Sequence, residues 1–382
     1  MVEYVSIGSL LTRKRDKAKT IGGKAPVYAV TNDKGFALSS DLHDFTIHSE
    51  DTANYMVVEK NDFAYNPSRL NIGSIAYFKN KGKGLISPMY VVFHADEKKV
   101  LPEYLFIVLK SEAVRNKIDS LKEEGARFRF DFKRWDLIQI PIPSLSEQTR
   151  IVEILDMFAA AIENMKQQIA ERRKQYEYYR DKLLDLEGKE GVEMKKLGDV
   201  GKFIRGTGIQ KSDFVEDGLP CIHYGQIHTS YGVSATRAIS KIEESLYKKS
   251  KKAVKGDVVL ATTSEDAEGC AKPVAWFGDK DVAVSGDAYI YHHNQNGKFM
   301  AYQFMTHNFM LFKVMNVKGA KVVRISGDNM AKYEFPLPPL QEQQRIVSIL
   351  DTFEATIANL EAQLKEREKQ YEYYRNKLLT FE

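Results

Sequence analysis

Apolar residues recur at alternating steps of four and three along two stretches of about 40 residues that contain neither proline nor glycine. The first stretch follows Pro143 and the second follows Pro339. A period of 3.5 residues predicts two long helices that pair along an apolar seam as a coiled coil. The seam positions most suited to this pairing are Ile151, Leu155, Phe158, Ile162, Tyr176 and Tyr179 in the first helix and Ile346, Leu350, Phe353, Ile357, Tyr371 and Tyr374 in the second.

The two stretches are copies of each other. The hexapeptide QYEYYR occurs at 175–180 and again at 370–375, and aligning 141–187 with 336–382 gives about 29 identities in 47 positions. Each helix therefore has its own copy as the nearest partner. The alternative is that each helix packs separately on its own domain, which would favour a wider stripe of period 3.6. Arg172 and Arg367 interrupt the seam at equivalent points, where they either fix the register or cover their neighbours with their alkyl chains.

Short runs of apolar or alternating residues, bounded by Gly, Pro, Asn and Asp, predict a globular domain before each long helix. In the first domain we expect strands at 27–30, 55–58, 74–78 and 89–93, a helical stretch from Pro102, and strands within 126–132 and 137–143. In the second we expect strands at 258–261, 274–276 and 288–293, a helical stretch at 299–315, and strands within 320–326 and 333–338.

The predicted fold class is therefore α+β, with two mixed α/β domains that are each followed by a long helix. The predicted boundaries are 1–143 for the first domain, 144–187 for the first helix, 188–338 for the second domain and 339–382 for the second helix. A chain of 382 residues is too long for one core and suits this division.

Composition indicates a globular protein, with 43% hydrophobic and 28% charged residues. No apolar run approaches the length that a membrane-spanning helix needs, so we expect no membrane association. The N-terminal segment places a short apolar patch before its basic residues, the reverse of a signal peptide. Cys221 and Cys270 have neither metal-ligand spacing nor a plausible disulfide framework. These features predict a cytoplasmic protein.

The net charge of +4 is unevenly distributed. Lys and Arg outnumber Asp and Glu by about 22 to 18 over residues 1–144 and by about 20 to 16 over 191–338, whereas the helical segments carry about 14 against 18. If the protein binds a polyanion, the two globular domains are expected to make the contact.

Several basic groups suit DNA phosphates or guanine edges. In RFRFDFKRW, strand alternation would place Arg127, Arg129 and Lys133 on one face and the phenylalanines on the other, although a merely solvated face would look the same. The residues with glycines around 206–208 could equally form an exposed turn. The full set of candidate DNA contacts is Arg13, Lys14, Arg15, Lys17, Lys79, Lys81, Lys83, Arg127, Arg129, Lys133, Arg205, Thr207, Gln210, Lys211, Lys248, Lys249, Lys251, Lys252 and Arg324.

Patterns typical of an enzyme are scarce. The stretch NKGKG at 80–84 lacks the spacing and the terminal Ser or Thr of a phosphate-binding loop, and NPSR at 66–69 has Ser68 where an amino-methyltransferase motif has a second proline. The adjacent His292 and His293 would lie on opposite strand faces, so we expect no metal site. We therefore expect the isolated chain to have no methyltransferase, nuclease or ATPase activity.

The motifs PIPSLSEQTRIVEILD and PLPPLQEQQRIVSILD, each followed by its QYEYYR copy, resemble the helical regions of the specificity subunit of type I restriction and modification systems. The resemblance covers the whole order of domain, helix, domain, helix. Between the domains it rests on size, element order and a strand after Gly256, GDVVLA, which we parallel with GSIAYF after Gly73.

The resemblance implies two target-recognition domains joined by an antiparallel coiled coil, each reading one half of a split, asymmetric site in double-stranded DNA. It implies a subunit without chemistry of its own, which assembles with two methylation subunits and, through them, with restriction subunits. S-adenosylmethionine, ATP and Mg²⁺ would belong to those partners, so no cofactor is expected in this chain.

Two other classes stay open. A coiled-coil adaptor or scaffold without DNA readout would need no basic globular domains and would show no salt-dependent DNA binding. A self-contained methyltransferase or nuclease would need a cofactor loop and a catalytic motif, which we do not find in this sequence.

Overall fold

A computed structural model describes residues 2–20, 25–31, 35–41, 52–121, 128–319 and 321–381. The chain forms two compact units: unit 1 comprises Met1–Lys166 with Ala362–Glu382, and unit 2 comprises Gln167–Glu361. Each unit thus contains one globular domain, the first part of one long helix and the last part of the other. The domain boundaries drawn from the sequence stay a prediction.

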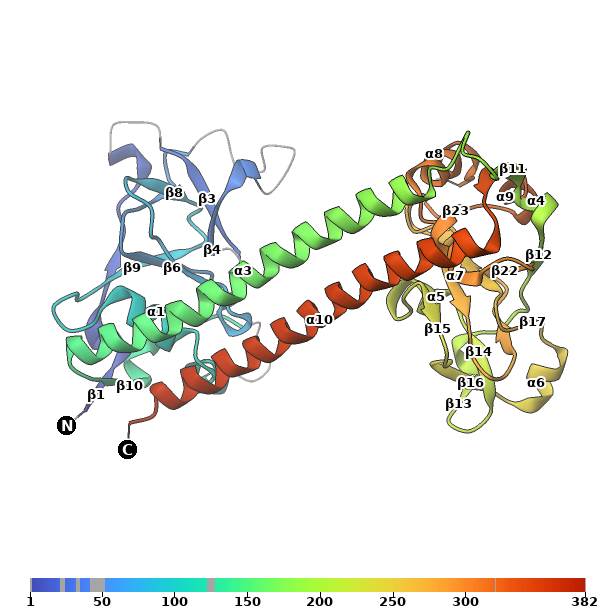
Figure 1. The fold of residues 1–382 in the computed structure, drawn as a ribbon. Helices are drawn as coiled ribbons and strands as arrows, with labels where there is room; N and C mark the ends of the chain where they lie inside the picture. Colours follow the sequence, from blue (N-terminus) through green and yellow to red (C-terminus); the bar gives the residue numbers. More distant parts are fainter. Residues whose placement is uncertain are drawn as a thin grey trace. The chain divides into compact units, whose positions relative to one another are not determined.

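The two long helices, α3 (Leu145–Leu184) and α10 (Leu340–Leu378), form and pack together as the apolar pattern predicts (Figure 1). The Ser144 hydroxyl accepts a hydrogen bond from the Glu147 amide at 3.3 Å, a cap that starts α3. In unit 1 the Phe158 ring stacks on Tyr374 at 5.3 Å, and in unit 2 Tyr179 stacks on Phe353 at 5.5 Å. From Phe158 to Tyr179 the residue number rises along α3, while the residue number of the stacking partner on α10 falls from 374 to 353. The two helices therefore run antiparallel.

The first turns of each long helix also belong to a globular core. Ile151 and Leu155 are buried in the core of unit 1, and Ile346 and Leu350 are buried in that of unit 2. The first turns of each seam thus pack into a domain core. At these turns each long helix packs on its own domain, as the alternative to helix pairing expects. Later seam positions, such as Phe158 and Tyr179, pair α3 with α10.

A buried glutamine fixes each long helix to its domain. The amide nitrogen of Leu101 donates to Gln148 Oε1 at 2.8 Å, and Gln148 Nε2 donates to the Pro143 carbonyl at 2.9 Å. In unit 2, Gln343 accepts from the Asn296 amide at 3.0 Å and donates to the Pro338 carbonyl at 2.8 Å. Both glutamines are fully buried, so each bond would be costly to lose. This clamp explains why the glutamine persists in both copies.

Unit 1 contains two four-stranded sheets, in the orders β2-β9-β6-β7 and β4-β3-β8-β5, and the pair β1-β10. The helical hairpin α1 and α2 packs beside the first sheet, and Lys110 between them donates to the Gly73 carbonyl. Apart from the long helices, the elements of unit 1 are β1 (Glu3–Ser6), η1 (Ile7–Leu10), β2 (Leu11–Lys14), η2 (Ala18–Thr20), β3 (Val27–Thr31), β4 (Gly35–Leu38), η3 (Ser39–Asp41), β5 (Met56–Val58), β6 (Asp62–Tyr65), η4 (Leu70–Ile72), β7 (Ile75–Tyr77), β8 (Gly84–Ile86), β9 (Val91–Ala95), α1 (Pro102–Leu109), α2 (Glu112–Ser120), η5 (Phe132–Leu137) and β10 (Gln139–Ile142), where η marks a 3-10 helix.

Unit 2 repeats this arrangement with one more strand in each main sheet. Its sheets have the orders β12-β22-β18-β20-β15 and β13-β16-β14-β21-β17, and shorter pairs join β11 to β24 and β19 to β23. The elements of unit 2 are β11 (Glu193–Lys196), α4 (Leu197–Val200), β12 (Gly201–Arg205), the 3-10 helix η6 (Lys211–Asp213), β13 (Phe214–Val215), β14 (Leu219–Ile222), α5 (Tyr224–Thr229), β15 (Ser234–Ala235), β16 (Ser240–Ile242), α6 (Glu244–Lys249), β17 (Lys252–Ala253), β18 (Val258–Ala261), β19 (Thr263–Ser264), β20 (Lys272–Trp276), β21 (Val282–Val284), β22 (Ala288–His293), α7 (Gly297–Gln303), α8 (His307–Asn316), β23 (Val323–Arg324), α9 (Gly327–Met330) and β24 (Glu334–Leu337).

Most of the strands expected from apolar runs are confirmed, but the one expected at 126–132 is wrong. Among the described residues there, 128–131 form no strand, and Phe132 begins η5. The alternation nevertheless persists, because Phe130 is buried while Arg129 and Lys133 are exposed. Asp131 caps the start of η5, and the extended segment before it alternates buried and exposed side chains with the two-residue period of a strand.

A buried aspartate paired with a cross-strand histidine recurs in both units. Asp62 lies opposite His94 in unit 1, with Asp62 Oδ1 and His94 Nδ1 3.0 Å apart. In unit 2 Asp257 Oδ1 lies 2.7 Å from His292 Nδ1. Each aspartate follows a residue with positive φ, Asn61 or Gly256, and its other oxygen accepts the amide of the residue three positions earlier.

This motif corrects the strand equivalence suggested by the sequence. The counterpart of GDVVLA is β6, which follows Asn61, and not the GSIAYF strand after Gly73, because β6 and β18 hold the same place beside the histidine-bearing strand. Burial raises the pKa of Asp257, and hydrogen bonds from the Val254 amide and His292 oppose that rise. The motif closes the turn before the central strand of each unit.

Candidate nucleic-acid interface

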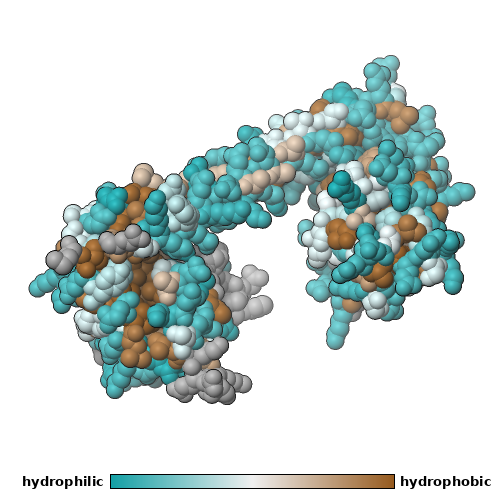
Figure 2. All heavy atoms as spheres, turned by 90° about the horizontal axis from the view of Figure 1, so that it is seen from below, coloured by the Kyte–Doolittle hydropathy of each residue, from teal (hydrophilic) through white to brown (hydrophobic). Residues whose placement is uncertain are grey.

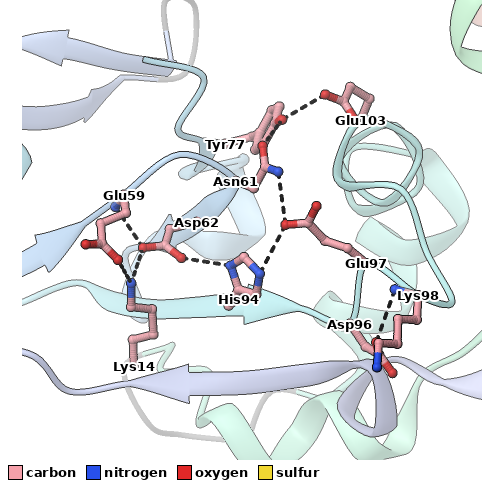
Figure 3. Close-up of polar contacts among 10 residues, drawn as sticks. All are labelled: Lys14, Glu59, Asn61, Asp62, Tyr77, His94, Asp96, Glu97, Lys98 and Glu103. Atoms are coloured by element: carbon pink, nitrogen blue, oxygen red, sulfur yellow. Dashed lines mark hydrogen bonds and ion pairs between the residues drawn. The ribbon is translucent and has the colours of Figure 1, made fainter. Parts of the chain in front are cut away.

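The candidate DNA contacts of unit 1 divide into a structural group and an exposed group. Lys14 belongs to the first, since its Nζ lies 2.7 Å from Asp62 Oδ2 and 2.9 Å from Glu59 Oε2 (Figure 3). Burial lowers the pKa of Lys14, but the hydrogen bonds to both carboxylates reverse this effect and raise it overall. Lys83 also pairs with Glu59, at 3.1 Å. Figure 3 shows His94 between Asp62 and Glu97, so this network is largely satisfied within unit 1.

The exposed group of unit 1 includes two arginines that are far apart in sequence. The Tyr65 hydroxyl donates to the carbonyl of Phe130, next to Arg129, at 3.3 Å. Burial and Asp131 raise the pKa of Tyr65, while Arg13 on β2 and Arg129 oppose this rise. Lys133 is exposed, and its amide donates to Asp131. Arg127 lies outside the described residues. The other exposed candidates are Arg15, Lys17, Lys79 and Lys81, of which Lys17 makes a backbone bridge with Met56 and Lys79 lies over the Tyr77 ring.

In unit 2 the candidates around 205–211 and 248–252 form one neighbourhood. The chain leaves β12 at Arg205, and the Thr207 hydroxyl then accepts a hydrogen bond from the Lys251 amide at 2.8 Å. Gly206 passes so close to the backbone of Ser285 that a Cβ there would lie 2.2 Å from the Ser285 carbonyl oxygen. Only glycine therefore allows the two segments to cross.

The remaining candidates of unit 2 surround this crossing or lie near it in the chain. Gln210 lies just before η6, and its amide donates to Asp213 Oδ2 at 2.7 Å, while Lys211, the first residue of η6, is exposed. Lys248 pairs with Glu244 within α6 at 2.7 Å, and Lys249 and Lys251 are exposed. Lys252 lies over the Tyr247 ring at 4.9 Å. Lys248 and Lys252 thus have partners inside the unit, while Lys211, Lys249 and Lys251 present their charge to solvent.

Arg324 in unit 2 occupies the same place as Arg129 in unit 1. Each arginine precedes a buried apolar residue, Phe130 or Ile325, whose amide bonds to a carbonyl beyond the central strand. The Phe130 amide donates to Pro67 and the Ile325 amide to Thr262, at 2.9 and 3.3 Å. Both arginines are exposed, so the domains have kept a cation at this position while their sequences diverged.

Three residues that no sequence pattern singled out, His223, Tyr224 and Asp287, join the neighbourhood of Arg205. Burial lowers the pKa of His223, and the positive charge of Lys211 lowers it further. The Asp287 carboxylate raises it, so Lys211 and Asp287 both lie near His223. The Tyr224 amide donates to the Ser285 hydroxyl at 2.9 Å. For Asp287 the sequence offers a signal, the turn-forming SGD at 285–287. No periodicity links this turn to residue 205.

The described residues hold no group of three or more His, Cys, Asp or Glu side chains arranged to bind a metal ion. Within the same ranges, no helix combines the length and the apolar character that crossing a bilayer would require. The basic and hydrogen-bonding side chains at the Arg205 crossing and around Tyr65 can donate to phosphates and base edges. This chemistry matches nucleic-acid binding.

Comparison with known proteins gives consistent results. A family model described as "Type I restriction modification DNA specificity domain" matches residues 2–172 and again 189–369. The chain is 31% identical over 317 residues to the type I restriction enzyme EcoR124I/EcoR124II specificity subunit of Escherichia coli, a match that covers 78% of this chain and 76% of that one.

Solved structures of the same fold are also known. A structure reported for the assembly and conformational transition of a type I R-M system matches with a TM-score of 0.64 at 18% identity, over 99% of this chain and 97% of that chain. The S subunit of a type I restriction-modification system from M. genitalium matches with a TM-score of 0.53 at 14% identity, over 100% and 97%.

Proposed function

This chain belongs to the family of type I restriction modification DNA specificity proteins, and from that premise we propose that it reads a two-part DNA target, one part with each unit. Sequence-specific DNA recognition is the role of a specificity subunit. A coiled-coil adaptor without DNA readout is not favoured, because both domains match the DNA specificity family.

The observation that carries the proposal is a repeated framework with unlike surfaces. The two units share their sheet order, their buried aspartate and their glutamine clamp. The turns before the histidine-bearing strands close with equivalent hydrogen bonds, from the Tyr90 amide to the Ser87 carbonyl and from the Ala288 amide to the Ser285 carbonyl, so Met89 in unit 1 stands where unit 2 has Asp287. An apolar side chain suits a thymine methyl group, whereas a carboxylate suits a cytosine amino group. Two different surfaces on one framework favour two different half-sites.

We further propose that the chain itself does no chemistry. The described residues at the candidate interface are cations, hydrogen-bond donors and the Asp287 carboxylate, groups suited to binding, and the partners would supply S-adenosylmethionine, ATP and Mg²⁺. The chain would direct two methylation subunits, and through them the restriction subunits, to the target.

The test of this function is the sequence that becomes methylated when the chain is assembled with its methylation subunits. We expect methylated adenines within one asymmetric sequence made of two specified parts and an unspecified gap. Single-molecule sequencing of DNA from cells that carry the system reads this out, and cells that lack only this chain are the control. Methylation that is unchanged without the chain would exclude the proposal.

The paired helices offer a docking site that is present twice. Tyr178, Tyr179 and Phe353 line a pocket in unit 2, and the equivalent Tyr373, Tyr374 and Phe158 line one in unit 1. Tyr178 and Tyr373 are each 60% exposed. Hydrophilic residues cover most of the paired helices in the view of Figure 2. Two equal pockets fit two copies of one partner, and we assign them to the methylation subunits.

Replacing Tyr178 by Ala is expected to remove one methylation subunit from the complex, and Tyr178→Ala with Tyr373→Ala to remove both. Exposed aromatic anchors of this kind contribute about 2 kcal/mol or more to an interface, or roughly 30-fold in affinity. The mass of the complex, measured by analytical ultracentrifugation at concentrations near its Kd, reports the number of bound copies. Tyr178→Phe and Tyr373→Phe keep the ring and should bind both. A double alanine variant that still holds two copies would refute the assignment.

A further inference from the structure

The guanidinium of Arg205 is held at the surface of unit 2 in a fixed orientation. Its Nε donates to the Gly286 carbonyl at 2.9 Å, while the side chain remains 66% exposed. The backbone on either side is tied down as well, because the Gly206 amide donates to the Ala288 carbonyl and the Thr207 amide to the Val284 carbonyl, at 3.0 and 2.8 Å. Arg205 is therefore oriented before it meets any ligand.

The two terminal nitrogens of Arg205 face solvent beside a carboxylate. Nη2 lies 4.0 Å from Asp287 Oδ1, and in the described part of the chain no closer partner engages either terminal nitrogen. An exposed ion pair at this distance contributes little to stability. Arg205 thus presents its two terminal nitrogens as hydrogen-bond donors beside the Asp287 carboxylate, which is an acceptor.

A DNA phosphate is a poor ligand for this arrangement, because the Asp287 carboxylate would repel it. The major-groove edge of a G·C pair fits both groups: guanine N7 and O6 accept from arginine, and the cytosine amino group donates to a carboxylate. We propose that Arg205 and Asp287 together read one G·C base pair in the half-site of unit 2. This inference rests on the proposed function and adds to it a named base pair.

Nearby cations suit a different task. Lys251, whose amide donates to the Thr207 hydroxyl, and Lys211, four residues after Thr207 in the chain, are both exposed. A lysine ammonium has no planar set of donors held in one orientation. It suits phosphate contact, which strengthens binding to every DNA sequence equally. Lys251 thus provides a matched control for Arg205 within the same neighbourhood.

The experiment maps the methylated sequences made by complexes that contain Arg205→Gln, Arg205→Lys or Lys251→Gln. With the unaltered chain, one position of the second half-site is a G·C pair. Both Arg205 variants should lower discrimination at that single position by about 10- to 100-fold, since lysine keeps the charge but lacks the fork. Lys251→Gln should weaken DNA binding at all sites and leave the sequence unchanged. Thermal melting of each purified complex verifies the fold.

Several results would overturn the inference. One is a second half-site without any G·C pair, and another is an Arg205→Gln complex that methylates all sites less but with unchanged preference. Discrimination retained at that position in both Arg205→Gln and Arg205→Lys would show that another residue reads the base pair. Failure of the proposed function itself looks different, because the unaltered complex would then direct methylation to no two-part sequence.

Discussion

Duplicating one heptad in each long helix should lengthen the gap in the target by about three base pairs and leave both half-sites unchanged. The natural places are the points where α3 and α10 pass from one unit into the other, after Lys166 and after Glu361, which are equivalent in the duplication. Repeating 160–166 and 355–361 adds about 10 Å of helix at 1.5 Å per residue. At about 3.4 Å per base pair this is close to three base pairs.

The helix pairing gives the physical reason. An insertion of seven residues in both helices preserves the antiparallel seam, because the stacked pairs Phe158–Tyr374 and Tyr179–Phe353 keep their heptad positions. The methylated sequence made by the variant complex is the measurement. An unchanged gap would show that something other than the paired helices sets the spacing.

An insertion of four residues in each helix is the matched control. It shifts the seam by half a residue from heptad register and rotates one end of each helix relative to the other. We expect recognition to weaken rather than to move to a new gap, so methylation should fall at all sites. Equal activity of the four-residue and seven-residue variants would show that the register of the seam has no role.

The sequence was most informative where a pattern repeats over many residues. The heptads of α3 and α10 and their duplication were readable without any structure, and so were the strands that coincide with apolar runs, such as β3 and β22. The strand expected at 126–132 was wrong, because the extended residues 128–131 and the start of a capped 3-10 helix at Phe132 carry the same alternation as a strand.

The interface could be read only in part, since its members come from separate segments. Arg205 was a candidate from its residue type and its glycine neighbours, but Asp287 lies more than 80 residues later and meets it only through sheet pairing. Lys14 shows the opposite case, because its residue type suggested DNA while the fold placed it against Asp62 and Glu59. Base readout depends on such placements, which periodicity does not determine.

Exchanging residues 1–143 for the matching segment of another family member should change one half of the target only. The exchanged segment contains β1 to β10 with Arg13 and Arg129, whereas the Arg205 neighbourhood stays intact in unit 2. The new segment must offer Gln148 an amide and a carbonyl as Leu101 and Pro143 do, because this clamp joins the domain to α3. Donor chains are therefore chosen that carry the Pro-x-Pro of 141–143 and the Glu-Gln of 147–148 at the same spacing.

The central claim, that each unit reads its own part of the DNA target, is tested most directly by the methylated sequence of this exchange and of the reciprocal exchange of 188–338. We expect each hybrid to combine one half-site of the original target with one half-site of the donor, at the original gap length. A hybrid in which both half-sites change, or in which neither changes, would contradict the account.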